Sequence, residues 1–291
     1  MKNGFLLIDK EIDFTSRDVC NIVSKRFNAR KVGHSGTLDP FATGLLIVGI
    51  NGATKTLSFL ESQFKTYEAS LLLGSKTDSG DLSGQTVETA PVPSIEIKDI
   101  KEVFSSLEGR IEQEVPLISA VRVKGKRLYE YARENEEVEL PTRSIDVLKL
   151  ELISFKDNVL TFKAVVSKGT YIRALGETIA EKLNTLGHLI YLRRTKILDM
   201  DVSMAKKVKE VDENDLIPTC DILRKVMPVK VITHKENLKK AQHGGKLSLK
   251  IFEEKIPLFC VSDDNNNYIA IYEYCDLGYY KCVRGYCFEN H

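Results

Sequence analysis

The sequence predicts an α+β fold in which a mixed, largely antiparallel sheet with flanking helices is followed by a small β-rich module. First, strand-like and helix-like segments interleave without a regular β-α-β rhythm. Second, several strand-like segments alternate apolar and polar residues, as half-buried antiparallel strands do. Third, the chain beyond about Asp221 consists of short β-prone pieces separated by turns. We therefore expect two domains, residues 1–222 and 223–291.

The N-terminal part predicts a strand, a helix and a second strand. The apolar run from Phe5 to Ile8 is typical of a buried strand. Thr15 or Ser16 can cap a helix whose apolar residues follow helical spacing. After a glycine-rich loop, the β-prone run 45–50 predicts the second strand. A loop set between fixed elements in this way can aim a functional side chain.

The middle of the chain continues this mixed pattern. Tyr67, Ala69 and Leu71 alternate with polar residues, which predicts a half-buried strand. Ser94 can cap a helix over the apolar residues that follow it. Segments 147–152 and 160–166 predict a hairpin, and segment 172–183 predicts a helix. A Lys-, Glu- and Asp-rich stretch, 204–215, reads as a linker before the C-terminal strands 257–261, 268–272 and 279–283.

Composition restricts the compartment and the kind of partner. The 291 residues are 43% hydrophobic, and they contain no apolar run long enough for a transmembrane helix. The short apolar stretch near the N-terminus is interrupted by Asp9, so it is too short for a signal peptide. We therefore expect a cytoplasmic protein with no membrane partner. The net charge is only +1, so any RNA-binding surface must come from local clusters of basic residues.

Two such clusters stand out. One lies between Asn21 and Leu38, and the other is the run 122–127; neither contains an acidic residue. The basic side chains of the second cluster are Arg122, Lys124, Lys126 and Arg127. Taken alone, each cluster could equally be an ordinary solvated face.

The six cysteines predict reduced thiols rather than a metal site. Four of them lie at or after Cys260, but no two have the C-x-x-C spacing. Structural zinc ligands usually come in such closely spaced pairs. We therefore expect neither zinc nor disulfides.

The most informative segment is the loop Gly33-His34-Ser35-Gly36-Thr37-Leu38-Asp39-Pro40-Phe41-Ala42-Thr43-Gly44. Its glycines permit positive φ and a close approach of the backbone to a ligand. Pro40 restricts Asp39 to extended conformations and so fixes the direction of its carboxylate. The run is neither a Walker-type phosphate loop nor G-x-G-x-x-G. By spacing alone it could be ordinary turn chemistry.

As a whole string, this loop resembles the catalytic loop of TruB-type tRNA pseudouridine synthases. The resemblance extends over 65–69, 77–84, 116–133, 169–175 and 191–194 in the family's order, from Phe5 to about Arg194. It implies that Asp39 is the catalytic carboxylate and that Arg173 is the active-site arginine, which pairs with Asp81. It further implies that Tyr67 stacks on the target base and that His34 contacts the RNA. The remaining residues that the resemblance places at the RNA are Tyr171, Leu192, Arg122, Lys124, Lys126 and Arg127.

The implied fold is a catalytic domain with a PUA-like RNA-binding module, whose entry Gly244-Gly245-Lys246 matches only weakly. The implied reaction is isomerisation of the uridine at position 55 in the T loop of tRNA, after base flipping. One bond to C1′ breaks and another forms, so the reaction needs no cofactor. A single carboxylate can act as nucleophile at C1′ or at C6, and a nearby arginine would hold it ionised and oriented. We expect a monomer that binds the tRNA T stem-loop and not DNA.

Three other readings remain open at this point. The chain could be the catalytic subunit of guide-RNA-directed pseudouridylation, or a non-catalytic protein that binds and refolds tRNA. It could also be a hydrolase with a carboxylate pair formed by Asp39 and either Asp78 or Asp81. One departure from the family is that Glu11 follows Lys10 where the family usually has proline. This departure leaves open how the N-terminal segment is held.

Overall fold

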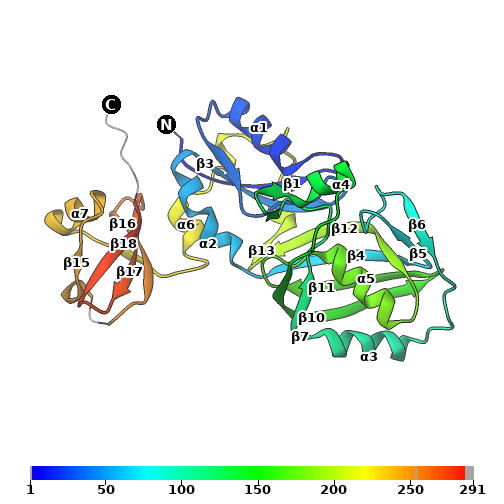
Figure 1. The fold of residues 1–291 in the computed structure, drawn as a ribbon. Helices are drawn as coiled ribbons and strands as arrows, with labels where there is room; N and C mark the ends of the chain where they lie inside the picture. Colours follow the sequence, from blue (N-terminus) through cyan, green and yellow to red (C-terminus); the bar gives the residue numbers. More distant parts are fainter. Residues whose placement is uncertain (1, 253, 286–291) are drawn as a thin grey trace.

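The computed structural model describes residues 2–252 and 254–285, in which the two larger sheets are separate (Figure 1). Cys287 and the end of the expected second domain lie outside the described residues. The larger sheet has nine strands, and its main path runs β1-β3-β12-β4-β11-β10-β7. Its strands are β1 Gly4–Lys10, β2 Val32–His34, β3 Thr43–Ile50, β4 Lys65–Leu73, β7 Gly109–Glu114, β10 Thr142–Lys156, β11 Val159–Val166, β12 Gly187–Ile197 and β13 Met200–Asp201.

This sheet confirms the predicted mixed, largely antiparallel core. The parallel pair is β3 with β12, where Thr43 lies opposite Arg193 and Gly44 opposite Arg194. The other pairs of the sheet are antiparallel. The parallel pair matters for function because it places the end of the Asp39 loop directly beside β12.

Helices cover the sheet because each one buries an apolar stripe against it. Helices α3 (Ile97–Leu107) and α5 (Ile172–Lys182) pack into the same core as β4, β10 and β11. Helix α1 (Ser16–Arg26) packs on one side of β1 and β3, and α2 (Leu57–Glu61) follows a 3-10 turn over Asn51–Thr56 on the other side. In the described part of the chain, no helix is long and apolar enough to cross a membrane.

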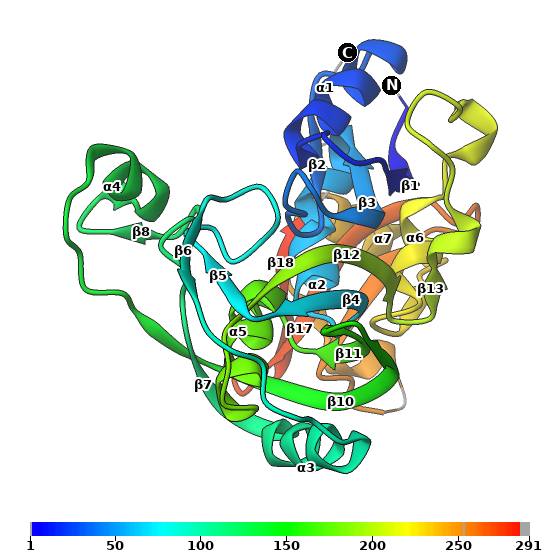
Figure 2. The ribbon, with the colours of Figure 1, turned by 90° about the vertical axis from the view of Figure 1, so that its right-hand side faces the viewer.

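Two short hairpins project from the main sheet. Strands β5 (Ser75–Thr77) and β6 (Thr86–Thr89) pair with each other, as do β8 (Arg122–Val123) and β9 (Lys126–Arg127). Helix α4 (Leu128–Glu134) follows β9 directly. Figure 2 shows α4 and β8 on an arm that stands out from the body of the molecule.

The second sheet has five strands in the order β14-β16-β17-β18-β15 and carries α7 (Lys235–Gln242). Its strands are β14 Val229–Val231, β15 Leu247–Ser248, β16 Leu258–Ser262, β17 Tyr268–Cys275 and β18 Tyr279–Gly285. Helix α6 (Thr219–Leu223) leads into this sheet. A buried cluster joins α6 to it, with Cys220 and Leu223 packed against Cys260 and Ile271.

Most predicted elements are confirmed, and two expectations are wrong. Thr15 is the N-cap of α1 and accepts a hydrogen bond from the Asp18 amide. The N-cap of α3, however, is Glu96 rather than Ser94, because Asp99 completes a capping box with Glu96. The stretch 204–215 is not a free linker. It contains short 3-10 turns, Val202–Met204 and Glu213–Asp215, and its backbone bonds back to β1 through Lys206.

Candidate active site

The Asp39 loop connects β2 to β3 and is fixed by backbone contacts on both sides of the aspartate. The Leu38 amide donates to Ser16 Oγ at 2.9 Å, and the Ala42 amide donates to the Asp39 carbonyl at 3.1 Å. Leu38 and Ala42 are both buried. The peptide on each side of Asp39 is therefore immobilised, while its side chain remains one-third exposed.

Lys10, at the end of β1, holds the same loop through hydrogen bonds to backbone carbonyls. Its Nζ donates to the carbonyls of Glu11, Phe14 and Pro40, at 3.0, 2.6 and 3.2 Å. Burial lowers the pKa of this ammonium to about 8. The segment with Glu11 in place of proline is therefore held by a lysine that ties it to the residue after Asp39. The Asp13 amide adds a second bond to the Pro40 carbonyl, at 3.0 Å.

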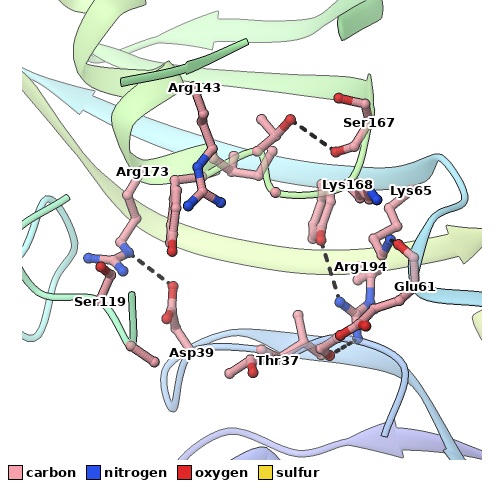
Figure 3. Close-up of a pocket in the computed structure, with 18 of the residues that line it drawn as sticks. Thr37, Asp39, Glu61, Lys65, Ser119, Arg143, Ser167, Lys168, Arg173 and Arg194 are labelled. Atoms are coloured by element: carbon pink, nitrogen blue, oxygen red, sulfur yellow. Dashed lines mark hydrogen bonds and ion pairs between the residues drawn. The ribbon is translucent and has the colours of Figure 1, made fainter. Parts of the chain in front are cut away.

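Arg173 reaches the Asp39 carboxylate from the first turn of α5. Its Nε lies 2.9 Å from Asp39 Oδ2 (Figure 3). The other guanidinium nitrogens donate to the Ser79 carbonyl at 2.6 Å and the Ile118 carbonyl at 3.0 Å. The guanidinium is 4% exposed, so three fixed oxygens define its orientation. A charge-assisted contact held in this way fixes the direction of the Asp39 carboxylate.

Asp81 stands behind Arg173, away from the cavity. Its Oδ2 lies 3.7 Å from Arg173 Nε, and its Oδ1 accepts hydrogen bonds from Ser79 Oγ at 2.8 Å and the Ser83 amide at 2.9 Å. Two carboxylates thus share one buried guanidinium, and Asp39 is the more exposed of the two. The structure brings Asp39, Arg173 and Asp81 together as the resemblance implied.

A cavity of about 640 Å³ opens over Asp39 (Figure 3). Its lining comes from the Asp39 loop, α2, β4, β12 and the loop that precedes α5. Of the predicted residues, Tyr67, Tyr171 and Leu192 also line it. Residues far apart in the sequence therefore form one concave site, of the size typical of small-ligand pockets.

Tyr67 and Arg194 form one wall of this cavity. Arg194 is 1% exposed, and its Nε donates to the Leu45 carbonyl at 2.7 Å. Its other nitrogens donate to the Gly36 carbonyl at 3.1 Å and to Tyr67 Oη at 3.4 Å. Arg194 thus connects β3, the Asp39 loop and the tyrosine. The sequence motifs predict no role for Arg194; the available signal is its place in a strand, where this arginine faces the core.

Tyr171 is held at the start of α5 by a side chain that the sequence analysis also missed. Gln113 on β7 is 5% exposed. Its Oε1 accepts from the Tyr171 amide at 2.8 Å, and its Nε2 donates to the Tyr171 carbonyl at 3.0 Å. This two-point contact fixes the backbone two residues before Arg173. No local sequence signal marks Gln113, because its partner lies on a distant strand–helix connection.

His34 lies outside the residues that line the cavity. It ends β2, and its Nδ1 accepts a hydrogen bond from the Gly36 amide at 3.3 Å. Burial, with Arg194 and Arg17 nearby, lowers its pKa below the usual value. The ring is therefore disposed to be neutral, and a contact with RNA at this position stays a prediction.

The basic run 122–127 forms the β8–β9 hairpin rather than part of the cavity wall. Although this run has no acid in sequence, α4 and the residues after it bring Glu134 and Glu136 to Lys126, at 2.5 and 2.8 Å. The guanidinium carbon of Arg127 lies 5.8 Å from the centre of the Tyr129 ring. A second cavity of about 1330 Å³ is lined by α4 and the residues that follow it, and Asp39 also lines it. The run is free of acids in sequence, but the fold places two carboxylates beside it, because the chain turns back on itself.

The described cysteines are free thiols, and Cys220 Sγ lies 3.9 Å from Cys260 Sγ. Within residues 2–252 and 254–285, no three or more His, Cys, Asp and Glu side chains gather as metal ligands would.

Comparison with known proteins gives a consistent family assignment. The model of the TruB family pseudouridylate synthase N-terminal domain matches residues 24–172. A protein named tRNA pseudouridine synthase B from Caldicellulosiruptor saccharolyticus is 40% identical over 252 residues, covering 87% of this chain and 86% of that protein. Its namesake from Mesoplasma florum is 33% identical over 285 residues and covers 98% of both chains.

Solved structures show the same fold. A chain from an H/ACA RNP bound to a substrate RNA containing 2′-deoxyuridine aligns with a TM-score of 0.71 over 97% of this chain and 84% of that one, at 19% identity. A chain of a Cbf5-Nop10-Gar1 complex aligns with a TM-score of 0.69 over 93% and 78%, at 23% identity. At such identities the likeness concerns the fold alone. The family match and the long alignments, by contrast, show that this chain belongs to the TruB family of pseudouridylate synthases.

Proposed function

We propose that this protein converts uridine to pseudouridine at position 55 in the T loop of tRNA, with Asp39 as the nucleophile. The observation that carries the proposal is the Asp39–Arg173 ion pair of 2.9 Å at the base of a cavity. Its relatives are named tRNA pseudouridine synthase B, which agrees with tRNA as substrate. In this reading the acid pair Asp39 and Asp81 is not a hydrolase dyad, because Arg173 stands between them.

The chemistry needs a carboxylate that is fixed in direction but open to the substrate. In the isomerisation the C1′–N1 bond breaks and a C1′–C5 bond forms, while the hydrogen on C5 is lost and N1 takes up a proton. Asp39 can supply the nucleophile at C1′ of the ribose or at C6 of the uracil. Arg173 balances the carboxylate charge and holds its orientation.

Base flipping provides access to these atoms. A uridine stacked in an RNA loop must leave the stack before a side chain can reach C1′ or C6. In our proposal the flipped base stacks on Tyr67, which is fixed by Arg194, and Tyr171 and Leu192 complete the pocket. His34 and the basic side chains of the β8–β9 hairpin contact the RNA outside the pocket.

We also propose that residues 1–222 act as the catalytic domain and residues 223–291 as a PUA-like module that binds RNA. The separate five-stranded sheet supports this division. Among its cations, Lys246 lies 4.1 Å from the centre of the Tyr279 ring, a pairing suited to an RNA surface. The protein is proposed to work as a cytoplasmic monomer.

Release of tritium from a tRNA transcript carrying 5-tritiated uridine tests the reaction. We expect the wild-type protein to release tritium without any guide RNA, and Asp39→Asn to release none above background. Asp146→Asn, at an exposed side chain of β10, is the matched control and should leave the rate unchanged. Full activity of Asp39→Asn would remove Asp39 from its role. Tritium release that requires an added guide RNA would favour guide-directed modification.

A further inference from the structure

Five cationic side chains and only two carboxylates line the cavity over Asp39. Three of the cations are already occupied. Arg173 binds Asp39 and two carbonyls, and Arg194 binds two carbonyls and Tyr67. Lys65 Nζ donates to the carbonyls of Glu61 and Gln63, at 2.8 and 2.9 Å. The two that remain are Arg143 and Lys168.

Arg143 lies near the start of β10, and its guanidinium points into the cavity (Figure 3). Its guanidinium carbon lies 5.7 Å from the centre of the Tyr171 ring. A side chain at Gly169 would place its Cβ 3.2 Å from Arg143 Nη1, so the glycine leaves room for the guanidinium. Within residues 2–252 and 254–285, the Arg143 guanidinium contacts no carboxylate and donates no hydrogen bond. Its half-buried donors are therefore free for a ligand.

Lys168 also lines the cavity and lies one residue before Gly169, in the connection from β11 to α5. It is exposed and, in the described part of the chain, forms no ion pair. Its charge reaches the cavity, since it contributes to the lowered pKa of Lys65. The side of the cavity formed by β10 and this connection thus carries two positive charges without a protein counterion.

We propose that Arg143, assisted by Lys168, binds a phosphodiester group of the RNA strand next to the target nucleotide. The inference rests on the proposed function and adds to it a backbone-binding site. A nucleotide flipped toward Asp39 brings its own 5′ and 3′ phosphates to the edge of the cavity, because they are covalently attached to its ribose. A planar guanidinium that already stacks on an aromatic ring suits a phosphate, since its donors form a fixed fork.

This contact would position the substrate for the reaction. A phosphate held at Arg143 fixes the ribose, and therefore C1′, relative to the carboxylate of Asp39. A displacement of about 1 Å at a reacting centre can cost roughly 100-fold in rate. Arg143 is thus a positioning residue, distinct from the arginine that holds the nucleophile.

The test uses a T-stem-loop RNA in which one phosphate, 5′ or 3′ to the target uridine, is replaced by an uncharged methylphosphonate. For the wild-type protein we expect one of these two substitutions to lower kcat/KM for tritium release by about tenfold, of the order of one lost charged contact. In the Arg143→Gln variant, the same methylphosphonate should lower kcat/KM little further, because the contact is already lost. Arg143→Lys should retain part of the effect, because it keeps the charge. Lys101→Gln on the exposed face of α3 is the control and should behave as the wild type does.

An equal loss in wild type and Arg143→Gln at both linkages would overturn the inference, because it would mean that Arg143 only supports Tyr171. Lys168→Gln, on an exposed connection, provides a second variant that leaves the Tyr171 contact intact and should also reduce the methylphosphonate effect. If the methylphosphonate effect on kcat/KM is the same in the wild type and in both variants, at either linkage, Arg143 and Lys168 do not bind a phosphate. Failure of the proposed function is distinguishable, since the wild type would then release no tritium from the all-phosphate RNA.

Discussion

At the scale of single residues, the site depends on cations that are buried against backbone oxygens. Lys10, Arg173 and Arg194 each bind carbonyls from segments distant in sequence. A buried charge is tolerated only where such partners satisfy it. These side chains therefore join the Asp39 loop to the sheet, and their removal should affect both the stability of the protein and the geometry of the site.

Lys10 gives a prediction on the pH dependence of stability. Burial lowers its pKa from 10.5 to about 8 in the folded protein. Between these two values the unfolded chain binds more protons than the folded chain, so the free energy of unfolding rises with pH. The stability contribution is complete above pH 10.5 and is lost as the pH falls through about 8. The stability of the wild type relative to Lys10→Met should therefore increase across this window by up to roughly 3 kcal/mol.

Urea denaturation of both proteins at several pH values measures this difference. Lys101→Met, on the exposed face of α3, is the control and should run parallel to the wild type. A difference between wild type and Lys10→Met that does not change with pH would show that Lys10 titrates normally in the folded protein.

A substitution at Gly44 tests how closely the end of the Asp39 loop approaches β12. Its φ is +104°, and an added Cβ would lie 2.3 Å from the Arg194 carbonyl oxygen. Gly109 has almost the same φ, +105°, but an added Cβ there meets nothing within 4 Å. Gly109→Ala should therefore cost about 1–2 kcal/mol of backbone strain, and Gly44→Ala at least about 3 kcal/mol, since the clash with backbone adds to it. Equal losses in chemical denaturation would mean that the close approach is absent.

At the scale of elements, the β8–β9 hairpin and α4 form a partly neutralised basic arm. Lys126 must leave Glu134 and Glu136 before it can bind a phosphate, whereas Lys124 has no such partner among the described residues. We expect Lys124→Gln to weaken tRNA binding and to flatten its dependence on salt by about one phosphate contact, and Lys126→Gln to have a smaller effect.

The acidic partners provide the converse test. Glu134→Gln together with Glu136→Gln should strengthen tRNA binding several-fold at low salt, because Lys126 becomes available. Titration of labelled tRNA at several salt concentrations measures both effects. Charge reversal of all four basic residues of the hairpin should weaken binding further, and an unchanged salt slope would make the arm an ordinary solvated face.

At the scale of the whole molecule, α6 connects the two larger sheets, because Ile222 packs against β1 and β3 while Leu223 packs against the C-terminal sheet. Leu223 on α6 is fully buried and packs with residues of β16 and β17. Leu223→Ala should lower the free energy of unfolding by about 2–4 kcal/mol, because it leaves a cavity. Leu277→Ala, at a side chain that is 77% exposed, is the control. In calorimetry, the unfolding temperature of the C-terminal sheet should fall most. An unchanged unfolding temperature would show that this packing does not hold the sheets together.

The sequence by itself determined several of the strands and helices, although not β7 or β12, together with the sheet class and the identity of the Asp39 loop. These follow from local periodicity, from caps such as Thr15 and from a long motif, all of which are readable in consecutive residues. The contacts of Arg194, Lys10 and Gln113 could not be predicted, because their partners lie on other strands. The tertiary structure alone decided that His34 stays outside the cavity, that Lys126 is paired with acids and that Arg143 is left without one. Charge and hydrogen-bond satisfaction depend on which segments meet in space, and only the fold determines that.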